Sequence, residues 1–222
     1  MRCIDHKGRH YYDMGGRRII VVATLVVAIF PICHFSFRER KRIMSESQQE
    51  TREEEVARVR GYLASQAMKR TPAQLVEVLR DAHHQFLEAT AAISDADFRT
   101  PPQDGEWAAA DVLAHVCTIA ALEEQSIRSI IEQGKQPAPV ADSIEAAPKE
   151  VTREAMLAEL EQSREQLFDV VLHADPTAHL DITWGHGEFG RMNWREWLLF
   201  ARVHALDHAR QMQAIATALA QQ

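Results

Sequence analysis

The segment from Asn193 to about Ala218 constrains the fold of this chain more than any other. It contains no Gly or Pro and consists mostly of good helix formers, so it predicts one long helix. Asn193 can cap the first turn, and Glu196 can reach back to the cap. One face of this helix is apolar apart from two histidines and carries Trp197, Ala201, His204, His208, Met212 and Ile215. A helix in a bundle turns such a face inward.

The two histidines on that face, His204 and His208, lie one turn apart. Two imidazoles at this spacing can bind one metal ion. The glutamate of the HExxH motif is missing, because Ala205 and Leu206 follow His204. The spacing alone therefore leaves two interpretations open: a metal-binding pair, and two histidines that pack in the core.

Four more helices and no strand are predicted ahead of this one. They are a polar lead-in helix within 44–70 and bundle helices at about 71–94, 106–133 and 152–174. Residues 134–149 form a long, proline-rich connection, which can return along the bundle so that its two flanking helices run parallel. Residues 177–192 are predicted to form a loop. The pattern indicates an all-α protein, with a four-helix bundle over 71–222.

The second bundle helix also has a histidine on its predicted inward face, which carries Val112, His115, Val116, Ile119 and Leu122. Three inward histidines, His115, His204 and His208, match a catalytic metal site that keeps one position open. Zinc is the default ion, and Ni, Fe or Mn also suit these ligands. Asp111 could orient the His115 ring or simply complement the helix dipole. Cys117 lies about 200° around the helix from His115 and is not expected to share the site.

Three other histidines are weaker candidates for a site. His83 and His84 lie mid-helix without a partner at ligand spacing, so packing or solvent positions suit them better. His186 lies in the glycine-bearing stretch 184–187 before the last helix, where it could line a pocket.

The charge of the chain is divided unevenly. Residues 1–43 hold nine Lys/Arg against three Asp/Glu, whereas residues 44–222 hold 16 against 29, and the whole chain has a net charge of -7. An acidic main body argues against a nucleic-acid partner, because phosphate contacts rely on Lys and Arg. The three cysteines form no CxxC motif, so neither a disulfide framework nor a thiolate zinc site is indicated.

The basic and apolar extension 1–43 allows three interpretations. Its apolar run, 19–30, is shorter than the roughly 20 residues that span a bilayer. The extension could be an upstream addition to a protein that starts at Met44, a membrane anchor within 19–37, or part of an exported protein without a clear cleavage site. The first interpretation places the protein in the cytoplasm, and the second tethers it to a membrane by its N-terminus.

Two short motifs connect the chain with a known family. A tryptophan leads into the second bundle helix eight residues before a histidine (Trp107, His115), and the last helix reads HxxxHxxQ (His204, His208, Gln211). With the TWGHGEFGRMNW loop and the long second crossover, these features resemble the DinB-like superfamily, which includes DinB and YfiT-like proteins, over about residues 72–218. The resemblance implies an up-down-down-up four-helix bundle with one divalent ion on the three histidines.

The resemblance also implies a range of activities. Characterised relatives are metal-dependent thiol transferases and isomerases that use bacillithiol, mycothiol or glutathione, and relatives are often dimers, which leaves a homodimer open for this chain. Many relatives carry a Glu five residues after the first histidine, where this chain has Ala120. We expect an enzyme that activates a low-molecular-weight thiol or water for transfer to a small electrophile. The alternative is a non-catalytic, metal-stabilised bundle that serves as a binding or stress-response module.

Overall fold

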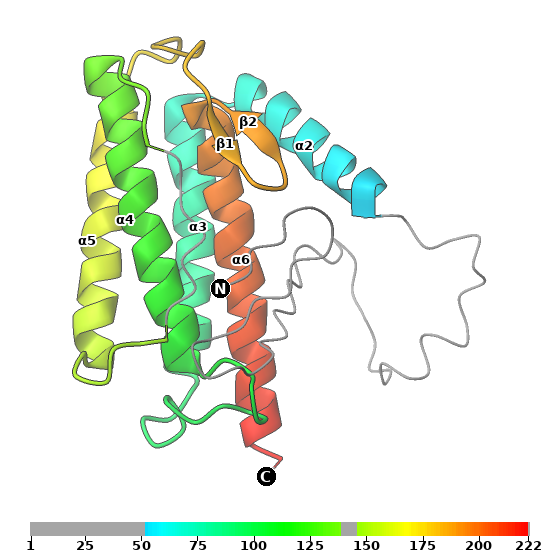
Figure 1. The fold of residues 1–222 in the computed structure, drawn as a ribbon. Coiled ribbons are helices and arrows are strands. Elements are labelled where there is room, and N and C mark those ends of the chain that lie inside the picture. The colour runs from blue at the N-terminus through cyan, green and yellow to red at the C-terminus, as the bar shows by residue number, and fades with distance from the viewer. Residues whose placement is uncertain (1–51, 139–145, 222) are drawn as a thin grey trace, which may run out of the picture.

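The computed structural model describes residues 52–138 and 146–221, which form an all-α protein (Figure 1). The lead-in helix is α2 (Arg52–Lys69), and the bundle consists of α3 (Pro72–Ala91), α4 (Ala109–Gln133), α5 (Arg153–Leu172) and α6 (Trp194–Leu219). The extension 1–43, with its three interpretations, lies outside the described residues. Within the described part, no helix is both long and apolar enough to cross a bilayer.

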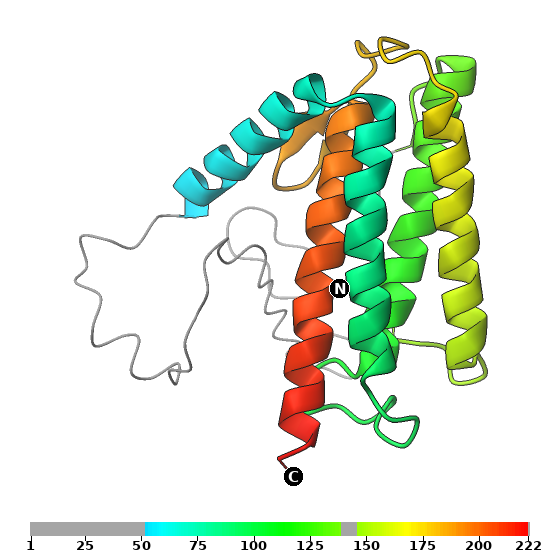
Figure 2. The ribbon, with the colours of Figure 1, turned by 180° about the vertical axis from the view of Figure 1, so that it is seen from behind.

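The bundle has the chain order that the long crossover predicted. Figures 1 and 2 show α3 and α6 running in one direction and α4 and α5 in the other, so the bundle is up-down-down-up. Helix α6 packs closely against α3 and also contacts α4, which in turn packs against α5. These contacts place the inward faces of α4 and α6 opposite each other, as a site shared by the two helices requires.

Local sequence signals set the helix ends. The Thr71 side chain accepts a hydrogen bond from the Gln74 backbone N–H, and the Gln74 side-chain oxygen accepts one from the Thr71 backbone N–H, which makes a capping box. Asn193 and Glu196 form the same arrangement at the start of α6. Gly134 ends α4 with a left-handed φ of 60°, and a Cβ there would lie 2.8 Å from the His179 ring. Only glycine fits both conditions.

The apolar core consists of two clusters along the bundle axis. The first apolar cluster packs the start of α6 against the start of α3 and the ends of α4 and α5. The second apolar cluster lies toward the other end. Members of the first include Leu75, Leu79, Ile127, Ile130, Leu167, Phe168, Trp197 and Ala201. Members of the second include Phe86, Ala89, Val116, Ala120, Met156, Leu160, Ala209 and Met212.

The segment 177–192, predicted to be a loop, contains a short hairpin. Strand β1 (Trp184–His186) pairs antiparallel with β2 (Gly190–Met192), with Gly185 opposite Arg191. The rings of Trp184 and Trp197 stack with centroids 4.8 Å apart, so the hairpin covers the first turns of α6. Strands of three residues are too short to show an alternating pattern in the sequence.

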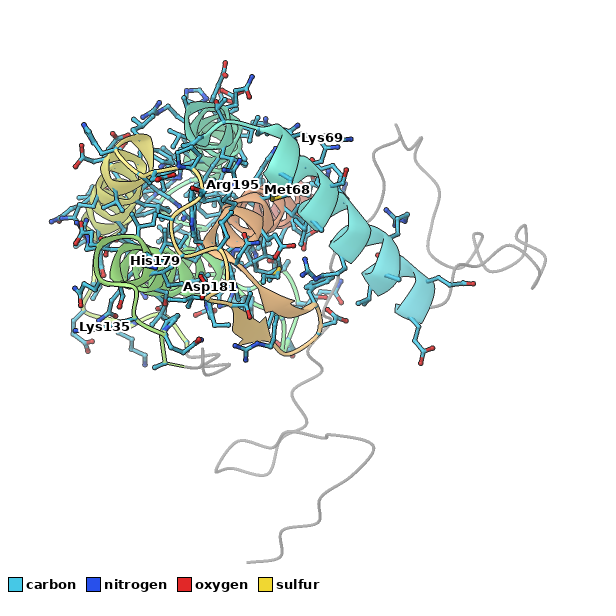
Figure 3. The ribbon with its side chains drawn as sticks, turned by 90° about the horizontal axis from the view of Figure 1, so that it is seen from above. Met68, Lys69, Lys135, His179, Asp181 and Arg195 are labelled. Atoms are coloured by element: carbon cyan, nitrogen blue, oxygen red, sulfur yellow. The ribbon has the colours of Figure 1, made fainter. Side chains whose placement is uncertain are left out.

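Helix α2 is attached to the bundle by two arginines. Arg60 forms an ion pair with Glu196 at 2.7 Å. Arg195, at the start of α6, donates through Nε and Nη2 to the carbonyl oxygen of Ala67 at 3.1 and 2.9 Å, and through Nη1 to that of Pro176 at 2.6 Å. The view along the bundle in Figure 3 shows Arg195 where the end of α2 meets the start of α6. Each of its three guanidinium nitrogens therefore donates to a backbone oxygen.

Candidate metal centre

His115, His204 and His208 converge on one point between α4 and α6. The Nε2 atom of His204 lies 3.1 Å from that of His115 and 3.0 Å from that of His208. The ring centroids of His115 lie 5.2 and 5.1 Å from those of His204 and His208, and the latter two are 4.3 Å apart. Each of the three residues offers one ring nitrogen, and these three nitrogens all lie within 4.8 Å of one another.

Helix geometry accounts for this convergence. His204 and His208 are four residues apart on α6, so their rings lie on the same side of the helix in successive turns. His115 lies near the start of α4, which runs antiparallel to α6 and reaches the same level from the opposite end. Two separate helices therefore supply the three imidazoles, and the packing of α4 against α6 fixes their distance.

Apolar and aromatic side chains surround the cluster. The Trp107 ring lies 5.4 Å from that of His115, and the Phe200 ring lies 6.0 Å from that of His204. His204 is buried, with 7% of its surface exposed, whereas His115 and His208 are half-buried. The cluster is thus shielded on the His204 side and reaches solvent past the other two rings.

The ring of His208 is oriented by a neighbour on the same helix. Its Nδ1 lies 2.8 Å from the side-chain oxygen of Gln211, one turn further along α6. An amide oxygen only accepts, so Nδ1 carries the proton and the Nε2 lone pair points toward the other two histidines. A hydrogen bond at the outer nitrogen is the usual way in which a metal-binding imidazole is fixed.

Burial keeps all three imidazoles neutral. Desolvation, followed by the charge of His208, lowers the pKa of His115 to about 4. The pKa of His204 is lowered well below its usual value, first by burial and then by the other two histidines. Burial also lowers the pKa of His208, although the bond to Gln211 opposes this shift. Metal ions bind the neutral form of imidazole, so these shifts favour coordination near neutral pH.

The donor set fits a divalent cation. A neutral imidazole that keeps its proton on Nδ1 has a lone pair on Nε2 and can only accept a hydrogen bond there. Three such Nε2 atoms cannot hydrogen-bond to one another, but all three can bind one cation. The outer nitrogens of His115 and His204 are buried and have no hydrogen-bond partner among the described residues. Tetrahedral zinc with nitrogen ligands at about 2.05 Å separates those ligands by about 3.3 Å, close to two of the observed distances.

Other predicted candidates lie elsewhere. Asp111 does not orient His115; its carboxylate accepts hydrogen bonds from the backbone N–H groups of Ala108 at 3.1 Å and Ala147 at 2.7 Å. It caps the start of α4 instead, and as an acid in the first turn it also complements the helix dipole. Cys117 is buried away from the cluster and donates to the Met156 carbonyl oxygen at 3.2 Å. Burial raises the pKa of its thiol to about 12, so it is no nucleophile.

The remaining histidines divide into core and surface positions. His83 is buried in α3, and His84 is exposed and lies 3.5 Å from Glu88. His186 is half-buried on the hairpin, with its ring 4.6 Å from that of Phe200. Its Nδ1 accepts backbone N–H bonds from Glu188 at 3.1 Å and Phe189 at 3.3 Å. None of the three belongs to the histidine cluster.

Two charged residues lie inside the bundle without having been predicted there: Glu123 of α4 and Arg164 of α5. Both are almost fully buried, and the pair forms an ion pair at 2.7 Å. The available signal was their spacing: Glu123 follows Ala120 and precedes Ile127 in the buried stripe of α4, and Arg164 follows Leu160 and precedes Leu167 in α5. The spacing puts each charge in line with an apolar stripe but does not show that it is enclosed, because most charged side chains reach solvent.

Comparison with known proteins agrees with this fold. TT2238, described as a four-helix bundle protein, aligns with a TM-score of 0.51 and 23% identity, covering 65% of this chain and 99% of that one. YfiT from Bacillus subtilis, described as a probable metal-dependent hydrolase with an unusual four-helix bundle topology, aligns with a TM-score of 0.55 and 12% identity, covering 67% of this chain and 87% of that one. No curated protein matches the sequence significantly. The DinB superfamily model matches residues 78–212, and the chain therefore belongs to the DinB superfamily.

Proposed function

We propose that His115, His204 and His208 bind one divalent metal ion and that the protein is a metal-dependent enzyme of the DinB superfamily. The observation that carries this proposal is the convergence of three neutral imidazoles, with ring nitrogens within 4.8 Å of one another, from two different helices. The description of YfiT as a probable metal-dependent hydrolase supports the same class of function. Zinc is the first candidate for the ion, since three histidines suit it well.

The proposed chemistry is activation of water or a low-molecular-weight thiol for attack on a small electrophile. A bound divalent cation lowers the pKa of a water or thiol that it coordinates and so supplies a nucleophile near neutral pH. Gln211 keeps the His208 Nε2 lone pair directed into the site. Phe200 and Trp107 form apolar walls beside the histidines, which limit the access of competing water.

A metal that only stabilises the bundle is the competing function. Structural zinc sites in proteins are almost always closed by four protein ligands, whereas catalytic sites have three and keep one position for water or substrate. The described residues supply three ligands to this cluster. The ligand count therefore favours catalysis over a purely structural metal.

Elemental analysis tests the metal part of the proposal. Full-length protein should contain about one equivalent of divalent metal, and His204→Ala should lose it. His84→Ala is the matched control, because His84 is an exposed histidine outside the cluster and its loss should leave the metal content unchanged. Metal-free wild-type protein that cannot be loaded with zinc, or a His204→Ala variant with full metal content, would refute the site.

Turnover separates the two functions once the metal is established. Zinc-loaded protein is mixed with a panel of activated esters, haloalkanes and maleylpyruvate, alone and with glutathione or bacillithiol. A metal-dependent rate that His204→Ala abolishes and His84→Ala retains supports an enzyme. No turnover above the uncatalysed background with any of these substrates supports the non-catalytic module.

A further inference from the structure

Helix α4 carries His115, and its apolar residues do not by themselves fix its rotation about its own axis. Between Val116 and Ile127, its buried residues are small or polar, namely Cys117, Ala120, Glu123 and Ser126. The larger apolar residues of this stretch, Ile119 and Leu122, are only half-buried. A rotation of α4 that enclosed Ile119 and Leu122 would bury at least as much apolar surface there. Apolar burial in this stretch therefore does not select the rotation that the structure has.

One buried ion pair joins the middle of α4 to α5. Arg164 donates through Nη1 to Oε2 of Glu123 at 2.7 Å, and neither side chain is more than 3% exposed. Arg164 Nε and Nη2 and Glu123 Oε1 are buried and have no hydrogen-bond partner among the described residues. A buried ion pair that is satisfied only in part adds little to stability, and apolar residues of similar volume often replace such a pair without loss. Stability alone therefore does not explain why this pair occupies the core.

The pair does select one arrangement of α4 against α5. A charge that is buried without its partner is strongly destabilising, so a rotation or shift of α4 that separates the two side chains is penalised. The 2.7 Å contact is also directional, since one guanidinium nitrogen donates to one carboxylate oxygen. Apolar contacts lack this directionality. Glu123 and Arg164 therefore meet in one rotation and one axial register of the two helices, which lie side by side in Figure 1.

The arrangement that the pair selects also decides where His115 lies. Glu123 is eight residues beyond His115 on the same helix, which is about 12 Å of helix rise or just over two turns. No Gly or Pro interrupts α4 between them, so the two residues turn together. Side chains reach about 5–6 Å from a helix axis, and a rotation of α4 by about 20° therefore moves the His115 ring by about 2 Å.

A displacement of that size is large for the histidine cluster. His204 and His208 both belong to α6 and keep their relative positions, whereas His115 comes from a second helix. Its Nε2 lies 3.1 Å from that of His204. Metal–ligand distances vary by only about 0.2 Å, so a bound ion requires precise placement of α4. Helix α4 packs more extensively against α5 than against α6, and its contacts with α5 therefore dominate that placement.

We propose that Glu123 and Arg164 are positioning residues for the metal site. Their ion pair fixes the rotation and register of α4 against α5 and thereby places His115 opposite the two histidines of α6. The proposal rests on the proposed function, since it gives the pair a role in metal binding. Neither residue binds the metal, and both act through His115. Removal of both charges together should therefore weaken metal binding and leave stability largely intact.

Zinc affinity and stability are measured together on the full-length protein. The double variant Glu123→Met with Arg164→Met removes both charges, so the net charge of the protein is unchanged. Its metal-free form should have a urea midpoint near that of wild type. Competition with a chromogenic zinc chelator should show zinc binding weakened about tenfold or more.

Leu167→Ala is the matched control. Leu167 is buried one turn from Arg164 on α5, and its truncation leaves the ion pair in place. This variant should have a lower urea midpoint, because it creates a cavity in the core. Its zinc affinity should stay within about twofold of wild type. The double variant and the control should thus lose different properties.

Two outcomes of the affinity assay would overturn the role of the pair. They are a zinc affinity of the double variant equal to that of wild type, and an equal loss of affinity in Leu167→Ala. If the double variant does not fold, Glu123→Asp keeps both charges but shortens the side chain, so the pair re-forms only if α4 moves toward α5. Zinc should then bind about tenfold more weakly, and an unchanged affinity would overturn the proposal.

Crystal structures separate a failure of this proposal from a failure of the metal site. If wild type binds no zinc, the proposed function fails, but the metal-free wild type and double variant can still be compared. The 3.1 Å distance between His115 Nε2 and His204 Nε2 should increase by about 1 Å or more in the double variant. An unchanged distance would show that the pair does not position His115.

Discussion

Gln211 offers the sharpest perturbation of the proposed metal site, because its side chain bonds to a single ligand, His208. Its side-chain oxygen lies 2.8 Å from His208 Nδ1. Gln211→Leu preserves the size and helix propensity of the side chain but removes the acceptor, which frees the His208 ring to rotate or change tautomer. Loss of such an outer hydrogen bond costs about 10- to 100-fold in metal affinity, or about 1.4–2.7 kcal/mol. Gln211→Glu retains an acceptor and should bind zinc at least as tightly as wild type.

The affinity is measured by competition with a chromogenic zinc chelator at neutral pH. Gln213→Leu is the matched control, because Gln213 lies on the same helix two residues away and is exposed. We expect wild type, Gln213→Leu and Gln211→Glu to bind zinc with similar or higher affinity and Gln211→Leu to bind it more weakly. If Gln211→Leu matches wild type within about twofold, the hydrogen bond does not orient a metal ligand, and the reasoning about His208 fails.

Three further predictions concern stability. The pKa of His83 is lowered from 6.5 to about 4, chiefly by burial and then by the charge of Arg164. The unfolded chain therefore binds more protons between these pH values, and this residue should remove about 3 kcal/mol of stability as the pH falls from 6.5 to 4. Urea unfolding of metal-free wild type and His83→Leu should differ in that window, and parallel pH profiles would contradict the shift. Arg164→Met should lower the free energy of unfolding by about 3–5 kcal/mol, because it leaves the Glu123 charge buried and unpaired. The double variant with Glu123→Met should recover most of that loss. If the effects of the two single changes in urea unfolding simply add up in the double variant, the two residues are not coupled. Phe86→Ala, in the second apolar cluster, should lower the free energy of unfolding by about 3–5 kcal/mol, whereas Leu172→Ala, at an exposed position, should change it little. Similar urea midpoints for the two variants would argue against this core.

The helices of the bundle could be predicted because their signals are local. Thr71, Thr152 and Asn193 cap the helices that they precede, and Gly134 ends α4 in the left-handed conformation that favours glycine. The inward face predicted for α6 is also the observed one, since five of its six residues are buried and His208 is half-buried. A single long helix with a clear apolar stripe leaves little freedom in how it packs.

The face of α4 was predicted less well. His115, Ile119 and Leu122 were expected to face inward, but they are half-buried, and the buried stripe is centred on Ala120 and Glu123. Apolar residues occur all around this helix, because it packs against both α5 and α6, so periodicity alone could not fix its rotation. The half-buried position of His115 is the one that brings its ring to the α6 histidines.

The buried ion pair of Glu123 and Arg164 was not predictable from single-helix patterns. Glu123 and Arg164 lie 41 residues apart on helices whose relative rotation decides whether two charged side chains meet in the core or face solvent. A charge within a helical stripe usually lies at the edge of the apolar face and reaches water. Only the packing of α4 against α5 shows that these two charges are enclosed together. The partnership of Gln211 with His208, by contrast, follows from a spacing of three residues on one helix.

X-ray absorption spectroscopy of the zinc-loaded full-length protein tests the central claim most directly. About three imidazole nitrogens should lie at about 2.0–2.1 Å from one bound ion, with light-atom ligands completing the shell. In His204→Ala this imidazole signature should be lost, and in His84→Ala it should be unchanged. A zinc shell dominated by sulfur, or an imidazole shell that persists in His204→Ala, would contradict the three-histidine site.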